Sequence, residues 1–171
     1  MDPRKNRPGF QPNLNETIPP SAVTTTLANQ LGLYVVMYSP LQMAADLPKN
    51  YMRFPDAFQF IKDVALDWDK SVYLEAEPGR FITIARKEKN SDNWFVGNSN
   101  GYNTRNATVD FSFLDGEKKY VATIYRDGKE ADYLTKPQEY VVESKIITSK
   151  TKLKIRTVAA GGFAISVYPN K

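Results

Sequence analysis

Residues 25–48 read TTLANQLGLYVVMYSPLQMAADLP, and this stretch decides the fold. Apolar side chains recur at helical spacing over about residues 22–38 and occupy nearly every face, which predicts a helix that is buried on most sides. Pro40 disfavours helical geometry in Ser39, so the helix is expected to end there. The apolar run Leu41–Ala44 then predicts a short buried strand. A buried helix followed by a buried strand is one step of an α/β fold, which indicates a piece of a larger domain.

The rest of the chain contains no second step of this kind. Pro55 suits a first helical position, and a second short helix is predicted from about residue 55 to residue 64. From about Ser71 the pattern changes to alternation of apolar and polar residues, which is typical of strands. Residues 1–20 contain five prolines and are predicted to form an extended arm.

The alternating region predicts eight strands. Val109, Phe111 and Phe113 alternate with polar neighbours, and Asp127-Gly128 is a strong hairpin signal. Short strands at this spacing indicate an antiparallel sandwich or barrel. The expected strands lie near residues 71–76, 80–87, 94–98, 106–113, 119–126, 139–147, 151–158 and 162–168.

Composition excludes several functions. The chain contains no Cys and no His, so it offers no thiol or imidazole as nucleophile, base or metal ligand. A net charge of +4 is too small to indicate nucleic-acid binding, and we expect no nucleic-acid partner. The polar start of the chain carries no secretory apolar region. The apolar run at residues 27–47 is interrupted by Gln30, Gly32 and Pro40, so we expect no membrane span.

The sequence resembles the C-terminal part of glycoside hydrolase family 97, the α-glucosidases and α-galactosidases typical of gut Bacteroidetes. The stretch from Thr25 to Tyr51 looks like the closing segment of the catalytic barrel in that family. The resemblance covers residues 23–168. It continues in order through Phe58–Val64, Asp67–Asp69, Leu74–Gly79, Ile82–Lys87, Trp94–Gly97, Phe113–Asp115 and Gly161–Ile165.

The resemblance implies both a fold and a function. The fold is mainly β: an eight-stranded antiparallel β-sandwich, preceded by two helices and a short strand left from the end of a (β/α)8 barrel. Residues 1–20 are then an arm, 21–68 the remnant of the barrel and 69–171 the sandwich. The implied function is a non-catalytic structural and oligomerisation part of an exo-acting α-glycosidase. Its implied partners are the rest of the barrel and further copies of itself, and the implied location is the periplasm.

The resemblance assigns no catalytic or metal-binding residue to this chain. Family members bind calcium and place their catalytic glutamates on barrel loops upstream of the matched segment, so we expect neither catalysis nor a cofactor here. Glycoside hydrolysis usually needs two carboxylates across the scissile bond. None of the local pairs is a convincing dyad: Asp67 with Asp69, Glu75 with Glu77, and Glu130 with Asp132.

Three residues are candidates for contact with a sugar. If Leu41–Ala44 is the last barrel strand, its C-terminal end faces the active site. Met43 and Asp46 would then lie near the substrate of an intact enzyme, unless Asp46 only caps the turn before Leu47. Tyr102 is the aromatic residue best placed in a loop to stack on a sugar ring. A stand-alone carbohydrate-binding module is therefore the alternative function, and an interaction protein unrelated to sugars is a third.

Overall fold

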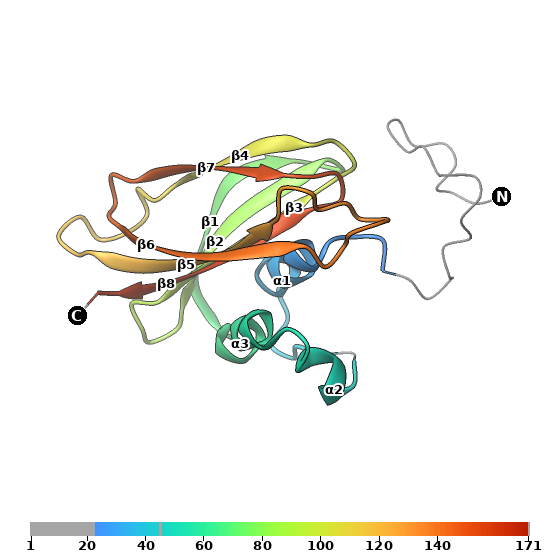
Figure 1. The fold of residues 1–171 in the computed structure, drawn as a ribbon. Helices are drawn as coiled ribbons and strands as arrows, with labels where there is room; N and C mark the ends of the chain where they lie inside the picture. The colour runs from blue at the N-terminus through green and yellow to red at the C-terminus, as the bar shows by residue number, and fades with distance from the viewer. Residues whose placement is uncertain (1–22, 45, 171) are drawn as a thin grey trace.

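The computed structural model describes residues 23–44 and 46–170, in which three helices precede eight strands (Figure 1). The predicted arm at residues 1–20 lies outside the described residues. The helices are α1 (Leu27–Val36), α2 (Pro48–Tyr51) and α3 (Pro55–Asp63). The strands are β1 (Trp68–Glu77), β2 (Phe81–Glu88), β3 (Trp94–Asn100), β4 (Arg105–Asp110), β5 (Tyr120–Asp127), β6 (Tyr140–Ile147), β7 (Lys152–Thr157) and β8 (Gly162–Pro169).

The strands form two antiparallel sheets, as the alternating pattern predicted. Six strands form one sheet in the order β1-β2-β3-β8-β5-β6, and β4 pairs with β7 in a second sheet. Figure 1 shows the small sheet on one side of the large sheet and the helices on the other. The predicted β-sandwich is confirmed. The large sheet is the middle layer of the molecule, between the small sheet and the helices.

Alternate residues of the central strands fill two separate cores. On β3, Val96 points toward the β4–β7 sheet, whereas Phe95 points toward the helices. Ile165 and Ala164 divide in the same way on β8. A sheet covered on both faces requires apolar residues at successive positions, which explains why β3 and β8 are apolar nearly throughout.

Helix α1 packs directly on the large sheet. Leu31 and Val35 are buried against the sheet, and both belong to the same core as Phe95. A Cβ atom at Gly32 would lie 2.3 Å from the backbone oxygen of Asn98, which leaves no room for a side chain. A glycine within a helix costs about 1 kcal/mol relative to alanine, and close packing is its reason here.

The α/β step predicted at residues 25–48 is only half correct. The helix is present, although it ends at Val36, but residues 41–44 do not form a strand. Leu41 and Met43 are 73% and 76% exposed. A strand requires a neighbouring strand to satisfy its backbone groups, and no described strand pairs with this segment.

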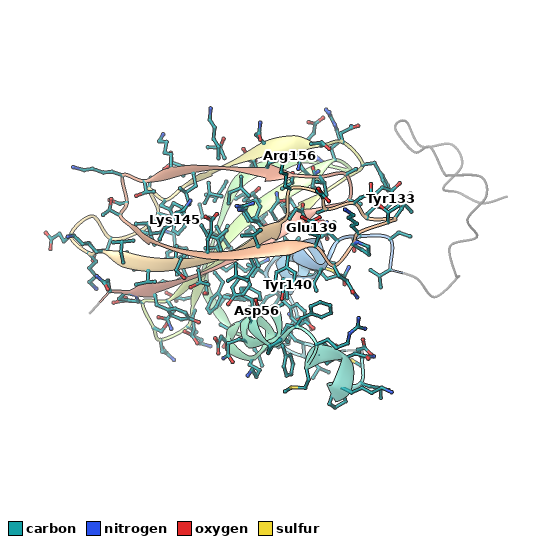
Figure 2. All side chains as sticks on the ribbon, viewed as in Figure 1. Asp56, Tyr133, Glu139, Tyr140, Lys145 and Arg156 are labelled. Carbon is teal, nitrogen blue, oxygen red and sulfur yellow. The ribbon has the colours of Figure 1, made fainter. Side chains whose placement is uncertain are left out.

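The other helices link this segment to the sandwich. The predicted helix at residues 55–64 is confirmed as α3, whereas α2 was not predicted. Phe60 of α3 is fully buried against the sheet, and the hydroxyl of Tyr140 on β6 donates a hydrogen bond to Asp56 on α3 (Figure 2). Burial and this bond to a carboxylate raise the pKa of Tyr140. Helix α3 therefore lies between the sheet and α2.

Candidate interface formed by the three helices

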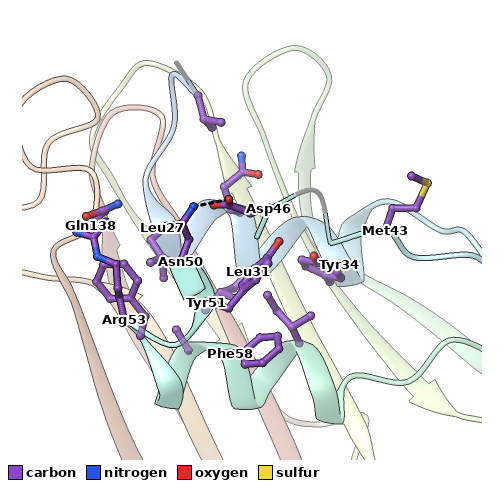
Figure 3. Close-up of a pocket in the computed structure, with 15 residues that line it drawn as sticks. Leu27, Leu31, Tyr34, Met43, Asp46, Asn50, Tyr51, Arg53, Phe58 and Gln138 are labelled. Carbon is purple, nitrogen blue, oxygen red and sulfur yellow. Dashed lines mark hydrogen bonds between the residues drawn. The ribbon is translucent and has the colours of Figure 1, made fainter. Parts of the chain in front are cut away.

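A groove of about 430 Å³ lies between the three helices (Figure 3). Helix α1 contributes its side that faces α3, and α3 contributes Ala57, Phe58 and Ile61. The rings of Tyr51 and Phe58 stack at 4.9 Å and close one side. The remaining lining residues are Val23, Leu27, Gln30, Leu31, Tyr34, Met43, Asp46, Asn50, Arg53, Phe54 and Gln138.

Asp46 and Met43 both line this groove but lie apart in it (Figure 3). The carboxylate of Asp46 accepts hydrogen bonds from Asn50 Nδ2 at 2.6 Å and from the backbone N–H of Leu47 at 2.7 Å. The bond from Asn50, followed by that from Leu47, lowers the pKa of Asp46. In this chain Asp46 therefore holds the start of α2. Its nearness to a substrate in a longer enzyme stays a prediction, as does that of Met43.

The described lining of the groove contains few groups that could take part in catalysis. Asp46 is the one carboxylate among the described residues that line it, so no acid–base pair spans the groove. Tyr34 is half-buried, and burial, with a smaller effect of Tyr51, raises its pKa. The lining combines apolar side chains of α1 and α3 with a few polar ones, a mixture that suits packing against another protein surface.

Exposed apolar side chains continue from the groove. Of the exposed large apolar residues in the described part of the chain, six fall within residues 37–52. Isolated exposed apolar residues are ordinary, but a concentration of them indicates an interaction surface. None of the six lies within a helix: they flank the ends of α1 and α2 or lie in the segment between them. We call this set the helical surface, after the helices that it connects; it consists of Met37, Tyr38, Leu41, Met43, Leu47 and Met52.

Tyr102 is not part of the helical surface: it lies in the loop between β3 and β4 of the sandwich. It follows β3 and is half-buried rather than well exposed, and its ring packs edge-on against that of Tyr133 at 5.7 Å. Tyr133 is itself 8% exposed. Stacking of Tyr102 on a sugar stays a prediction.

The carboxylates singled out in the sequence have structural contacts. Glu75 forms an ion pair with Arg105 at 2.8 Å and accepts a hydrogen bond from the backbone N–H of Thr108, so it ties β1 to β4. Glu77 pairs with Arg80 across the turn. Similar contacts join Asp67 to Lys89 and Glu130 to Lys136. Within the described residues, no three carboxylates gather as a metal site would require.

Sequence reasoning missed two polar residues that hold α1 in place. Arg86 on β2 donates from Nε to the carbonyl of Val35 at 2.7 Å, so a cation lies at the negative end of the helix. At the other end, the hydroxyl of Thr26 donates to Asp127 Oδ1 at 2.6 Å. Asp127 was read only as part of a hairpin signal. Nothing local in the sequence indicates either contact, because the partners are 51 and 101 residues apart.

Asp127 is a buried junction. Its Oδ2 accepts hydrogen bonds from the backbone N–H groups of Val158 at 3.1 Å and Gly162 at 3.0 Å, in addition to the bond from Thr26. Burial raises the pKa of this carboxyl and outweighs the three donors, each of which favours the charged form. Asp127 thus joins α1, β5 and the turn before β8.

Comparison with known proteins supplies the family. The family described as glycosyl-hydrolase 97 C-terminal, oligomerisation, matches residues 67–168, more than half of the chain. The chain belongs to this family. The resemblance to family 97 and the expected assignment to its C-terminal, oligomerisation part are therefore confirmed.

Two relatives are α-galactosidases by name. The chain is 39% identical over 142 residues to the retaining α-galactosidase of Bacteroides thetaiotaomicron, covering 83% of this chain and 21% of that protein. It is 28% identical to a probable retaining α-galactosidase of Streptomyces bingchenggensis, covering 80% of this chain and 20% of that protein. The family 97 chain thus spans about a fifth of the length of these relatives.

Solved structures agree with the fold. A family 97 enzyme from Pseudoalteromonas sp. strain K8, solved with acarbose, shares 43% identity and a TM-score of 0.84, over 86% of this chain and 23% of that one. A β-arabinopyranosidase at 23% identity has a TM-score of 0.66 and supports the fold alone. Within the described part of this family 97 chain, no helix is long and apolar enough to cross a bilayer.

Proposed function

We propose that this chain is the non-catalytic structural and oligomerisation part of an exo-acting α-glycosidase of the α-galactosidase type. Its family supports the oligomerisation role, and its 39% identity to the α-galactosidase of Bacteroides thetaiotaomicron supports the type of enzyme. The chain corresponds to about a fifth of that enzyme, so the catalytic groups would be supplied by the other four fifths. Any calcium would be bound there as well, and the enzyme would act in the periplasm.

The observation that carries this proposal is the helical surface. Six large apolar side chains of residues 37–52 are exposed, in the segment that connects α1 to α2 and directly after α2, and one of them, Met43, lines the groove. Exposing this much apolar surface is unfavourable by about 25 cal/mol per Å². We infer that the rest of the catalytic barrel covers the helical surface, so that the segment joins the sandwich to the barrel.

A chimera tests this function. The corresponding C-terminal fifth of the Bacteroides thetaiotaomicron α-galactosidase is replaced by this chain, and hydrolysis of an aryl α-galactoside is compared with the parent enzyme and with an enzyme that lacks this fifth. We expect the chimera to be soluble and active and the truncated enzyme to be insoluble or inactive.

Two variants of the chimera test the surface itself. Leu41→Glu and Met43→Glu each place a charge on a side chain that is more than 70% exposed in this chain, so they leave its own fold intact. Both should lower the melting temperature of the chimera. Lys150→Glu, an exposed change in the turn between β6 and β7, is the control outside this segment. A chimera no better than the truncated enzyme would show that this chain does not serve as the C-terminal part.

A further inference from the structure

The two edges of the six-stranded sheet differ in regularity. β1 forms one edge, and its register with β2 shifts twice, between Trp68 and Lys70 and again between Tyr73 and Glu75. β6 forms the other edge, and its register with β5 is unbroken from Tyr140 to Ile147. Irregularities protect an edge from pairing with a further strand, whereas a regular edge remains competent for pairing. β6 is therefore the open edge of this sheet.

Alternate residues of β6 direct their backbone N–H and C=O groups away from the sheet. The N–H of Gly128 donates to the carbonyl of Glu139 at 3.1 Å, and these residues lie opposite each other in the same register as the β5–β6 pair. Hydrogen-bonded pairs alternate in antiparallel strands, so the odd-numbered residues of β6 bond to β5. Val142, Ser144 and Ile146 consequently direct their N–H and C=O groups away from the sheet.

We propose that β6 pairs antiparallel with β6 of a second copy of this chain, around a two-fold axis at Ser144. This inference rests on the proposed oligomerisation function and names the surface that performs it. A two-fold axis perpendicular to the sheet keeps each face on its own side. Ser144 then lies opposite the partner's Ser144, Glu143 opposite the partner's Lys145, and Val142 opposite the partner's Ile146.

The side chains of β6 favour this register. Glu143 and Lys145 have side chains that are 32% and 46% exposed, and their opposite charges meet across the axis twice. Ile146 is 59% exposed and gains an apolar neighbour on the face that carries α3. Moving the axis to Glu143 or to Lys145 would place like charges opposite each other. Glu143 and Lys145 also form an ion pair with each other within β6, at 3.4 Å. Of the axes at residues 143, 144 and 145, charge complementarity favours the one at Ser144, and Figure 2 shows Lys145 on this strand.

A charge exchange tests the pairing in the full chain. Multi-angle light scattering after gel filtration should give a dimer for the wild type. Glu143→Lys and Lys145→Glu each place like charges across the axis and should weaken the dimer at least tenfold. The double variant restores opposite charges and should dimerise again. Glu117→Lys, in an exposed turn, is the matched control and should leave the dimer intact.

Mixing the two single variants separates pairing from misfolding. Each copy of one variant meets the opposite charge on the other, so the mixture should form heterodimers even though Glu143→Lys removes the ion pair with Arg126. A dimer that persists in both single variants would overturn the β6 surface and leave oligomerisation through another surface standing. A wild-type chain that stays monomeric at all soluble concentrations would overturn both the β6 surface and the proposed oligomerisation function.

Discussion

Gly32 marks the closest approach of α1 to the sheet, and replacing it tests how the helix is seated. In Gly32→Ala, the new Cβ would lie 2.3 Å from the backbone oxygen of Asn98 and 2.8 Å from that of Phe163. Neither oxygen can rotate away, because both belong to paired strands in the middle of the sheet. The helix must therefore move away from the sheet by roughly 1 Å to reach an ordinary contact distance.

The cost follows from two opposing effects. Overpacking of this kind destabilises a protein by about 1–3 kcal/mol, and backbone neighbours place the cost near the upper limit. Replacing glycine by alanine within a helix returns about 1 kcal/mol. The expected net loss is about 2 kcal/mol, which corresponds to a fall in melting temperature of roughly 4–8 °C for a chain of this size.

Thermal unfolding followed by circular dichroism measures this change. Gly116→Ala is the control, because its Cβ would meet only Ser149 Oγ at 3.8 Å, and its melting temperature should change little. A Gly32→Ala variant that is as stable as the wild type, or more stable, would refute the close packing of α1 on the sheet. Helix propensity alone predicts a Gly32→Ala variant that is more stable than the wild type, because alanine favours a helix more than glycine does.

The remaining predictions concern polar contacts and the independence of the sandwich. Asp127→Ala leaves two buried backbone N–H groups without an acceptor and should cost about 3 kcal/mol of unfolding free energy in urea titration. The folded state raises the pKa of Asp127, so the folded protein binds this proton more tightly than the unfolded chain does. Its contribution to stability therefore falls as pH rises from the unfolded pKa near 4 through the folded value, and the stability of Asp127→Asn relative to the wild type should increase over that window. Arg86→Met removes the donors at the C-terminal end of α1 and should speed amide hydrogen exchange in its last turn, whereas unchanged exchange would exclude a capping role. A chain that begins at residue 69 exposes Phe95 and its neighbours, and gel filtration should find it aggregated; a soluble monomer with a cooperative melt would show that the sandwich is independent. The full chain should not hydrolyse an aryl α-galactoside above background.

Local patterns in the sequence determined the strands and most of the helical content. Alternation of Phe163, Ile165 and Val167 with smaller or polar residues predicts that these three side chains share one face of β8, because successive side chains on a strand point to opposite faces. The family was also recognisable from short motifs spread over residues 23–168.

Only the tertiary structure decided which segments pair as strands and which distant side chains meet. Residues 41–44 have the composition of a buried strand but remain unpaired, because a strand needs an edge to bond with and no described strand offers one. Arg86 meets Val35, and Asp127 meets Thr26, across separations that no local pattern reports. The candidate surfaces have the same origin: the order of strands leaves β6 at an edge, and the packing of the described elements leaves the helical surface uncovered.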